Sequence, residues 1–502
     1  MRGLNEKWMS SLIGNIRLAD KDRVFYRYSD EQHSYYDLCK AVEKICALLQ
    51  KAPDGPVVVY AEKSFSTYAA ITAILLSGKC WVQISTSSPS AHIKGVLDQL
   101  DPGLIIVDGV SSTNLEEKID LAEVNYANVN EILTNSEPAE IDYRIPEADN
   151  VAMIYFTSGS TGIPKGVRIT FGNMTAMIEQ LSEILPYRDD DVLADYHELS
   201  FVISIPVLCF VLFTGRAISP SLTKIESWLP MKHLLDNLVT TLITLPSTME
   251  CIKRLTGGRG VEIQLDTLVL CGEPLKSNLL KFVLDEINPD RCINFYGSTE
   301  VSPWVFSHEC KREDTINPKY AGVTPIGKAL SMVDYEIDED SILNVSGPQV
   351  SFGYLHEDNE SFYAKGNKWW FKTGDIVEVE GDVLLCKGRY DSQIKISGHR
   401  VDLIEIEVVA ANTLNLQFVH AFHMEKESGG QIVLVLKSDE TDWASGQLVK
   451  ELAKVLPGYK VPAQIYFIDE VPINKNGKLD RKKVKQDYLA ASQANTDARN
   501  IE

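Results

Sequence analysis

The sequence predicts an α/β protein with a large N-terminal region of mostly parallel sheets and flanking helices, followed by a small, mobile α+β subdomain. Short apolar runs alternate with helical segments along the first part of the chain, an order that is typical of parallel sheets. A glycine-rich polar string interrupts this pattern near residue 160. We place the large region at 1–390, the small subdomain at 391–490 and a disordered polar tail at 491–502.

Hydrophobic periodicity predicts the elements in chain order. Residues 5–50 indicate an amphipathic helix, a short hairpin and a second helix, and the polar segment 110–145 favours loops. Asn173 is a candidate N-cap for a helix that ends near Leu185. Apolar runs predict strands at 56–61, 81–84, 104–107, 151–156, 167–170, 241–245 and 267–271, and helices at 66–78, 93–100 and 201–213. The small subdomain alternates strands and helices over 408–414, 418–424, 431–437, 444–456 and 464–468.

Composition excludes several classes of function. The net charge of −21 argues against nucleic acid as a partner, because binding phosphate backbones requires a basic face. The longest apolar run is too short to span a membrane and no signal peptide is evident, so we expect no membrane contact. Nine scattered cysteines, none at C-x-x-C spacing, indicate neither a zinc site nor a redox dithiol and suit a cytoplasmic protein.

The polar string has the composition of a phosphate-binding loop. It lies between two predicted strands and reads Thr157-Ser158-Gly159-Ser160-Thr161-Gly162-Ile163-Pro164-Lys165-Gly166. Its glycines let the backbone approach a ligand, while its hydroxyls, backbone N–H groups and Lys165 can bind phosphate oxygens. It differs from the common G-x-x-x-x-G-K-[ST] loop because Lys165 follows a proline and a strand follows the loop.

Five further stretches stand at predicted strand ends or turns, and each would be an ordinary turn in isolation. Gly272 and Glu273 follow a strand at the edge where open α/β sheets bind ligands. The others are Asn294-Phe295-Tyr296-Gly297-Ser298-Thr299-Glu300, Phe371-Lys372-Thr373-Gly374-Asp375, Gly388-Arg389-Tyr390-Asp391, continued by Gly398-His399-Arg400-Val401-Asp402, and Asn476-Gly477-Lys478-Leu479-Asp480-Arg481.

Together these motifs, in their order and spacing, resemble the adenylate-forming superfamily of acyl-CoA synthetases, luciferases and peptide-synthetase adenylation domains. The resemblance covers about residues 10–486. Ser160, where acyl-CoA synthetases more often carry threonine, favours the adenylation domains. The stretch from Gly398 is a looser match, because Asp402 and Ile404 stand where the superfamily has Glu and Gly.

The resemblance implies ATP and Mg²⁺ as cofactors. Lys165 and the loop hydroxyls would hold the β- and γ-phosphates. Tyr296 would stack on adenine, Thr299 would bond the α-phosphate, and Glu300 would bind the metal, which prefers one or two carboxylates plus substrate phosphates. Lys478 would bridge the substrate carboxylate and the nucleotide.

The resemblance also assigns the remaining motifs. Asp375 and Arg389 would bind the ribose. Asp391 would be the hinge about which the small subdomain swings, and the backbone near Gly398 would line the tunnel of an incoming thiol. The implied reaction makes an acyl-adenylate from a carboxylate and ATP and then a thioester.

Carry-over from amino-acid-adenylating relatives places Val202 where those enzymes have an aspartate that pairs with the substrate ammonium. A buried ammonium without a partner is costly, so we expect α-amino acids to be poor substrates. Phe295 and Trp304 favour a substituted aryl acid such as an amino- or hydroxybenzoate, and a short aliphatic or β-amino acid is the alternative. The expected pocket comprises His197, Val202, Ile203, Pro206, Thr244, Val269, Cys271, Phe295, Pro303 and Trp304.

The acceptor is expected to be the phosphopantetheine thiol of a carrier protein. Only 24 residues follow Lys478, so this carrier would act in trans. The general pattern resembles stand-alone carrier-protein ligases, including the D-alanine–carrier-protein ligase group, in non-ribosomal peptide or related secondary metabolism. CoA is the alternative acceptor. A non-catalytic nucleotide-binding relative and a luciferase-like oxygenase are competing hypotheses, and the key residues of all the motifs argue against the former.

Overall fold

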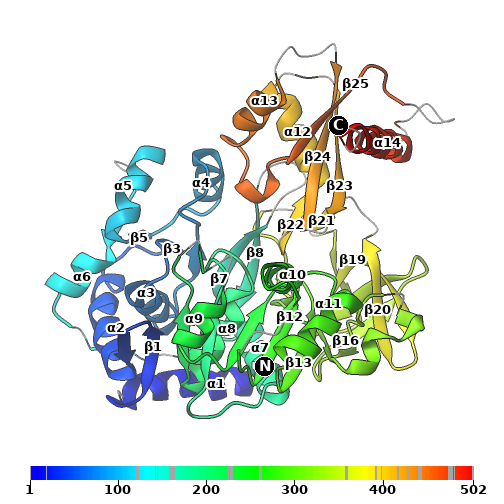
Figure 1. Cartoon of the computed structure of the whole chain (residues 1–502). Coiled ribbons are helices and arrows are strands. Elements are labelled where there is room, and N and C mark those ends of the chain that lie inside the picture. The colour runs from blue at the N-terminus through cyan, green and yellow to red at the C-terminus, as the bar shows by residue number, and fades with distance from the viewer. Residues whose placement is uncertain are drawn as a thin grey trace. The chain divides into compact units, whose positions relative to one another are not determined.

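The computed structural model divides into two compact units, one of Met1–Thr157 with Pro164–Asp391 and one that contains Ser392–Glu502. The described residues are 2–18, 20–119, 124–138, 140–141, 143, 145–157, 164–223, 225–226, 230–258, 263–320, 322–356, 360–389, 393–396, 398–414, 416, 418–426, 429–438, 444–472, 479 and 481–499. Figure 1 shows the elements coloured along the chain.

A nine-stranded sheet forms the centre of the large unit. Its inner strands β1, β10, β9, β11, β12 and β13 are parallel, and antiparallel strands flank them on both sides. The parallel strands are short and almost wholly buried, as expected when both faces of a sheet are covered. Its strands are β1 (Val24–Tyr28), β2 (Glu31–Ser34), β9 (Val192–Asp195), β10 (Ala217–Pro220), β11 (Thr241–Thr244), β12 (Thr267–Cys271), β13 (Arg291–Tyr296), β14 (Phe306–Glu309) and β15 (Lys328–Ala329).

Two further sheets belong to the same unit. A six-stranded sheet has the order β6-β5-β3-β4-β7-β8, parallel except for the last pair. An antiparallel sheet pairs β16, β17, β19, β18 and β20. Their strands are β3 (Val57–Tyr60), β4 (Trp81–Gln83), β5 (Leu104–Val107), β6 (Tyr126–Asn128), β7 (Val151–Thr157), β8 (Lys165–Thr170), β16 (Asp334–Ile337), β17 (Ile342–Ser346), β18 (Phe362–Lys365), β19 (Lys368–Glu380) and β20 (Val383–Arg389).

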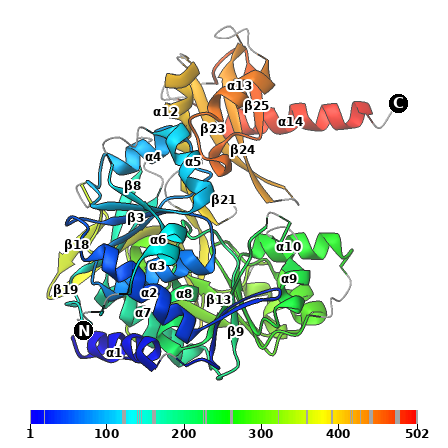
Figure 2. The same cartoon turned by 90° about the vertical axis from the view of Figure 1, so that its left-hand side faces the viewer.

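Helices pack on these sheets and enclose the main core. Helices α2 and α3 lie side by side, with α6 against both (Figure 2). The helices of the large unit are α1 (Arg2–Leu18), α2 (Tyr35–Leu49), α3 (Phe65–Leu76), α4 (Ser90–Leu97), α5 (Gly109–Lys118), α6 (Val129–Asn135), α7 (Phe171–Ile184), α8 (Ser204–Thr214), α9 (Pro230–Asp236), α10 (Pro246–Leu255) and α11 (Ser277–Phe282).

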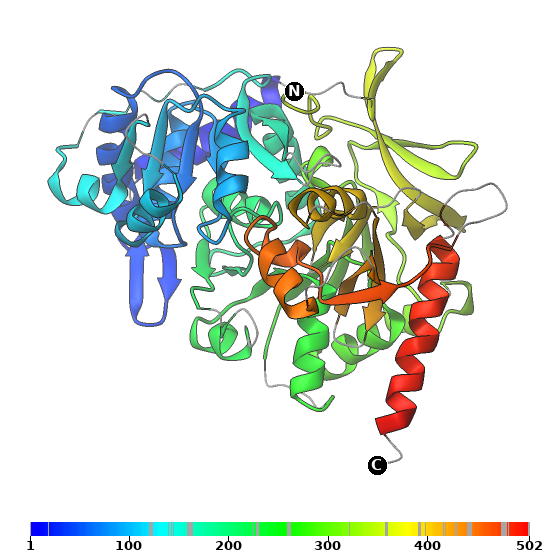
Figure 3. The same ribbon diagram turned by 90° about the horizontal axis from the view of Figure 1, so that it is seen from above.

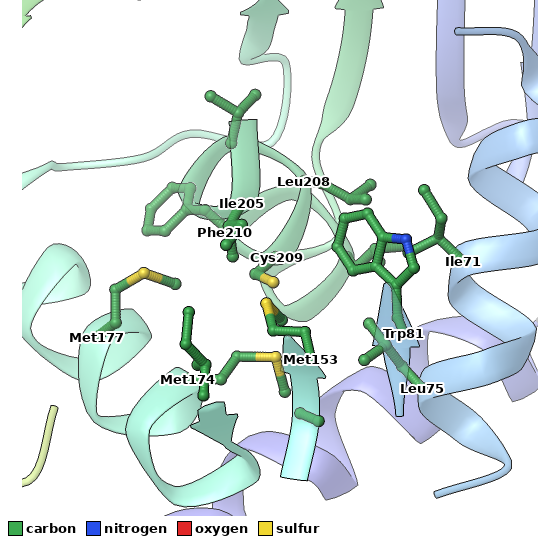
Figure 4. Packing of buried hydrophobic residues seen from close by; sticks show 14 of the residues in the cluster. Ile71, Leu75, Trp81, Met153, Met174, Met177, Ile205, Leu208, Cys209 and Phe210 are labelled. Atoms are coloured by element: carbon green, nitrogen blue, oxygen red, sulfur yellow. The ribbon is translucent and has the colours of Figure 1, made fainter. Parts of the chain in front are cut away.

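Helix α8 is buried along its whole length, as its uninterrupted apolar sequence predicts. Figure 4 shows Cys209 of α8 next to Met153 of β7, with Met174 of α7 and Trp81 in the same cluster. Methionine side chains adapt to irregular gaps, which suits a junction of strands and helices from separate parts of the chain. This junction joins the two largest sheets into one core.

The start of helix α7 differs from the prediction. Thr170, rather than Asn173, is the N-cap, and the two residues bond reciprocally: Asn173 N–H donates to Thr170 Oγ1 at 3.1 Å, and Thr170 N–H donates to Asn173 Oδ1 at 2.9 Å. The Asn173 amide also donates to the carbonyls of Pro348 and Val350, at 2.7 and 3.1 Å. Asn173 therefore fixes the segment that follows β17, as well as the helix start.

The segment 110–145 is more regular than we predicted, since it contains α5, β6 and α6. Asp108 caps α5 by accepting hydrogen bonds from Val110 N–H at 3.0 Å and Ser111 N–H at 2.6 Å. The helix is polar and mostly exposed, with Leu115 among its few buried residues. Hydrophobic periodicity is therefore too weak to reveal it.

The small unit packs helices on both faces of a three-stranded sheet. Alternate residues of β24 point to opposite sides: Leu434 joins a core with α12 and α13, whereas Val433 joins a core with α14. Figures 1 and 3 show α14 on the opposite side of the sheet from α12 and α13. The elements are the hairpin β21 (Gln393–Ile396) and β22 (His399–Asp402), α12 (Leu403–Leu414), β23 (Val419–Lys426), β24 (Gly429–Lys437), α13 (Ser445–Leu452), a 3-10 turn (Gly458–Lys460), β25 (Gln464–Ile468) and α14 (Arg481–Arg499).

Helix α14 continues to Arg499, through residues that we expected to be disordered. Val484 and Tyr488 are buried in the first half of the helix. Alanines in the later part have high helix propensity, which favours the helix there. Within the described residues, no helix combines the length and apolar character needed to cross a membrane.

Candidate active site

The end of β13 brings the Y-G-S-T-E segment to the ligand-binding edge of the nine-stranded sheet. Phe295 pairs with Cys271 of β12, and the strand ends at Tyr296. A Cβ atom on Gly297 would lie 2.0 Å from the carbonyl oxygen of Pro303, so this position accepts only glycine. The chain then forms a 3-10 turn over Thr299–Val301. Thr299 and Glu300 are thus presented immediately beyond the strand.

Glu300 and Lys165, predicted from two separate motifs, contact the same tyrosine. Tyr354 O–H donates to Glu300 Oε1 at 2.9 Å, and Lys165 Nζ lies 5.4 Å from the centre of the Tyr354 ring. Glu300 is fully buried and Tyr354 nearly so. An isolated bridge between Val167 and Tyr354 holds the tyrosine beside β8. The carboxylate of one motif and the ammonium group of the other therefore contact a single side chain.

A second group of predicted residues meets on the antiparallel sheet. Tyr296 O–H donates to one carboxylate oxygen of Asp375, and Arg389 Nη1 donates to the other at 3.0 Å. Asp375 N–H donates to Thr373 Oγ1 at 3.0 Å within strand β19. Burial, reinforced by the negative charge of Asp375, raises the pKa of the Tyr296 hydroxyl well above its ordinary value. Tyr296 therefore remains a neutral donor to the Asp375 carboxylate.

The neighbouring strand ends supply Gly272 and Glu273. Gly272 has a φ of +80°, which turns the chain sharply after β12. Glu273 accepts a hydrogen bond from Ser247 N–H at 2.9 Å at the start of α10. Behind them, Cys271 Sγ donates to the Thr244 carbonyl at 3.7 Å. These contacts tie the ends of β11 and β12 together at the same edge of the sheet as Phe295.

Half of the residues of the expected acid pocket belong to one apolar cluster. The rings of Phe295 and Trp304 stack with centroids 4.7 Å apart and planes 10° apart. Both rings are buried, and Val202 is half-buried against the same cluster. Pro206, Thr244 and Pro303 are also buried, while His197 is half-buried and contacts Phe201 edge-on. The members of the cluster include Ile203, Val269, Cys271, Phe295 and Trp304.

The loop that carries His197 and Val202 is held by hydrogen bonds to its backbone. Ser204 Oγ lies within hydrogen-bond distance of the carbonyls of His197 and Glu198, at 2.9 and 3.0 Å. Tyr155 O–H donates to the Leu199 carbonyl at 2.7 Å. Because these donors are buried, the loop is fixed before any ligand binds.

A buried charged network lies at the base of this loop. Lys63 Nζ donates to the backbone carbonyl of Asp195 at 2.6 Å and lies 3.9 Å from the Asp195 carboxylate. The same carboxylate accepts a hydrogen bond from Tyr68 O–H at 2.5 Å. Burial raises the pKa of Asp195 and lowers that of Lys63, while their mutual attraction opposes both shifts. The network anchors β9 to α3 just before His197.

Several predicted residues cannot be placed in this geometry. The residues outside the described part of the chain are Ser158, Gly159, Ser160 and Thr161 of the predicted phosphate loop, the predicted hinge Asp391, and Lys478. Thr157 and Lys165, at the two ends of the phosphate loop, pair across β7 and β8. Gly398 belongs to the small unit, at the tip of a hairpin. In the described part of the chain, no three His, Cys, Asp or Glu residues gather as a metal cluster.

Sequence reasoning missed Tyr354, which connects two predicted site residues. A signal was present in Gly353-Tyr354, a glycine and aromatic residue after an apolar strand. That pattern alone is too common to identify a site. Only the pairing of this segment with β8 reveals its role, through Leu355 N–H donating to the Gly166 carbonyl at 2.8 Å.

Known proteins resemble this chain along nearly its whole length. The family model described as AMP-binding enzyme matches residues 17–355. The D-alanine–D-alanyl carrier protein ligase of Staphylococcus aureus (strain JH9) is 25% identical, with the alignment covering 95% of this chain and 99% of that protein.

Two solved structures share the fold. The Vibrio cholerae adenylation domain AlmE, in complex with glycyl-adenosine-5′-phosphate, superposes with a TM-score of 0.82 at 20% identity, covering 97% of this chain and 98% of that one. The o-succinylbenzoate CoA synthetase MenE of Bacillus subtilis gives a TM-score of 0.80 at 21% identity, covering 96% and 98%. Because the family model spans more than half of the sequence, this chain belongs to the AMP-binding enzymes and is an AMP-forming adenylating ligase.

Proposed function

We propose that this enzyme activates a carboxylic acid that lacks an α-ammonium group, using ATP, and then transfers the acyl group to the phosphopantetheine thiol of a separate carrier protein. The observation that carries the proposal is the pair of contacts from Tyr354 to Glu300 and Lys165. It unites two motifs whose residue types suit a metal-bound polyphosphate. The Tyr296–Asp375–Arg389 group supplies a carboxylate that suits ribose hydroxyls.

The residues present fit Mg²⁺. Glu300 offers a buried carboxylate oriented by a hydrogen bond, and Mg²⁺ in nucleotide sites uses one or two carboxylates together with substrate phosphates. Glu300 would hold the ion, whose charge would neutralise the polyphosphate when bound. The ammonium group of Lys165 would contact the same phosphates.

The chemistry proposed has two steps. A carboxylate oxygen of the acid forms a bond to the α-phosphorus of ATP, and the bond to pyrophosphate breaks. The carrier thiol, losing its proton, then forms a bond to the acyl carbon, and AMP leaves with the bonding electron pair. The protein contributes positioning and charge stabilisation rather than a nucleophile. We assign Lys478 to the first step and the hairpin around Gly398 to the second, with Asp391 as the hinge between them.

A substituted aryl acid is the substrate class that we favour. Val202 offers no charge to an α-ammonium group, and Phe295 with Trp304 forms a flat aromatic wall. Offset stacking on such a wall is worth about 0.5–1.5 kcal/mol beyond the burial of apolar area.

One observation favours a smaller acid as the second candidate. The rings of Phe295 and Trp304 stack directly on each other, so a substrate ring cannot enter between them without separating them. A short aliphatic or β-amino acid needs no such movement. The names of similar proteins mention D-alanine and a glycyl-adenylate, whose acids are small but carry the α-ammonium group that Val202 does not pair.

A carrier protein is the acceptor that we favour, and CoA is the alternative. The name of the similar S. aureus ligase specifies a carrier protein, whereas MenE is a CoA synthetase. Carrier proteins are generally acidic, and residues 475–485 include six lysines or arginines. This local basic segment would meet an acidic carrier despite the net charge of −21.

Pyrophosphate exchange across aryl, short aliphatic, β-amino and α-amino acids tests the first step. We expect the fastest exchange with an aryl acid, and faster exchange with an α-amino acid would overturn the substrate assignment. A repeat with CoA and with phosphopantetheinylated carrier proteins identifies the acceptor. Lys478→Ala should lower exchange by about 10²- to 10³-fold. Lys454→Ala, which removes a surface partner of Glu451, is the matched control.

A further inference from the structure

One face of the hairpin β21–β22 packs against the core of the small unit. Ile396 and Val401 are buried among α12, α13 and the three-stranded sheet. The hairpin turns at Gly398, whose φ of +75° favours glycine. Ile396 pairs with His399 across the strands, so His399 follows the tip directly. Core packing fixes the base of the hairpin, and the orientation of its tip requires further contacts.

One such contact comes from a distant part of the sequence. The His399 ring stacks on the Tyr459 ring with centroids 3.9 Å apart and planes 8° apart. Tyr459 lies in the 3-10 turn Gly458–Lys460, which follows α13. The stack therefore joins the tip of the hairpin to the 3-10 turn. Burial, with a smaller contribution from Lys460, lowers the pKa of His399 to about 4, so its ring is neutral near pH 7.

The next residue of the turn makes a buried ion pair. Lys460 Nζ lies 2.6 Å from Glu405 Oε1, and the two side chains are 3% and 4% exposed. Glu405 is in the first turn of α12, directly after the hairpin. Because removing two charges from water offsets most of their attraction, a buried pair contributes little net stability compared with apolar residues of the same volume. What such a pair supplies is a fixed geometry, here between the 3-10 turn and the start of α12.

We propose that the His399–Tyr459 stack and the Lys460–Glu405 ion pair form a clamp that orients the hairpin tip at Gly398 for the thiol-transfer step. The role rests on the proposed function, in which this hairpin serves the second step and Lys478 the first. Tyr459 and Lys460 act as positioning residues. Their loss should therefore slow thioester formation and leave adenylation unchanged.

The first test compares Tyr459→Leu with Tyr459→Phe in the full-length enzyme. Leucine removes the stacked ring, whereas phenylalanine keeps it. We expect Tyr459→Leu to slow thioester formation by about three- to tenfold, the range for one aromatic pair, with pyrophosphate exchange unchanged. Tyr459→Phe should transfer like the wild type. Equal losses in both steps, or no loss in either, would contradict a role confined to thiol transfer.

The ion pair needs a double substitution, because Lys460→Met alone would leave a buried carboxylate without its partner and could prevent folding. The variant Lys460→Met/Glu405→Leu replaces both charges with apolar groups of similar volume. We expect this variant to fold with a modestly lower melting temperature, because the buried carboxylate of Asp402 also interacts with Lys460 and loses its attraction. Adenylation should match that of the wild type while thioester formation falls. If the pair were purely structural, thioester formation and adenylation would change together. If this variant forms the thioester as fast as the wild type, the ion pair is not part of the clamp.

Hydrogen exchange of peptides covering 393–402 tests the clamp without any acid or acceptor. Exchange should accelerate in Tyr459→Leu and in the double variant, stay unchanged in Tyr459→Phe, and remain slow in β23–β25 of all four proteins. Unchanged hairpin exchange would overturn the clamp. A looser hairpin in an enzyme that forms no thioester with any thiol would instead support the clamp and overturn the proposed second step.

Discussion

Tyr354 donates a hydrogen bond to Glu300 at 2.9 Å, although 53 residues separate the two in the chain. The same tyrosine ring lies 5.4 Å from the Lys165 ammonium group. One side chain therefore fixes the relative position of the carboxylate assigned to the metal and the cation assigned to the phosphates. Glu300 is fully buried, so its orientation depends on such contacts rather than on solvent.

Replacing Tyr354 with phenylalanine should impair nucleotide use while preserving the fold. The ring beneath Lys165 remains, but the hydrogen bond to Glu300 is lost. A hydrogen bond to a charged group is worth about 1.5–3 kcal/mol, so kcat/KM for ATP in pyrophosphate exchange should fall about 10- to 100-fold. The Mg²⁺ concentration for half-maximal exchange should rise as well.

Tyr363→Phe is the matched control for this substitution. Its hydroxyl donates to Asn344 Oδ1 at 3.1 Å within the antiparallel sheet, away from both Glu300 and Lys165. Its exchange kinetics should equal those of the wild type. If both tyrosine variants lose the same activity, the loss reflects general destabilisation, and Tyr354 has no specific role at the site.

The sequence was sufficient for much of the fold because its parallel strands are continuous apolar runs. The strand at Leu104–Val107 and the one at Thr267–Cys271 have the predicted bounds. Helix α5 was not predicted because it has few buried apolar residues and begins at the Asp108 cap, so its sequence shows no clear hydrophobic periodicity. The start of α7 was misplaced because Thr170 and Asn173 are both acceptable caps, and only their reciprocal bonds distinguish them.

Candidate residues could be named from the sequence where they lie in local motifs, but not where they depend on pairing between distant segments. Each motif alone is an ordinary turn, and it was the resemblance of the motifs to a known superfamily that named Glu300 and Asp375 as candidates. The position of Tyr354 depends on its bridge to Val167, and that of Trp304 on stacking against Phe295. No local pattern encodes such contacts.

Asp375→Asn should weaken recognition of the ribose. The carboxylate already accepts from Tyr296 and Arg389, but its remaining lone pairs can still accept from ribose hydroxyls. Removing the charge should raise KM for ATP and reduce the preference for ATP over 2′-deoxy-ATP, measured by exchange with each nucleotide. Asp382→Asn, at an exposed turn before β20, should retain that preference. An unchanged preference in Asp375→Asn would remove Asp375 from the ribose site.

Val202→Asp should confer activity on small α-amino acids. The new carboxylate would provide the partner that an α-ammonium group needs in a desolvated pocket. We expect exchange with glycine or D-alanine to rise above the wild-type rate and exchange with the preferred acid to fall. Val202→Asn has nearly the same shape without the charge and should show no such gain. Equal gains in both variants would mean that pocket size, rather than charge, excludes amino acids.

His399 should make the stability of the protein depend on pH. Its folded-state pKa is about 4, below the ordinary value of 6.5. Between these values the unfolded chain binds a proton that the folded chain does not, so stability rises with pH through this window and is lost as pH falls from 6.5 toward 4. From these two values the loss between pH 7 and pH 5 should be about 2 kcal/mol.

The variant His399→Phe isolates this contribution, because it keeps an aromatic ring against Tyr459 and cannot titrate. The free energies of unfolding of both proteins are compared at pH 7 and pH 5. They are measured from denaturant midpoints, with hydrogen exchange in β23–β25 as the readout of unfolding in the small unit. We expect the stability of the wild type relative to His399→Phe to decrease at pH 5, since only the wild type must keep an imidazole deprotonated to fold. If the difference in stability between the two proteins is the same at both pH values, His399 accepts a proton as readily in the folded unit as in the unfolded chain. Its ring would then not be buried against the turn at Lys460.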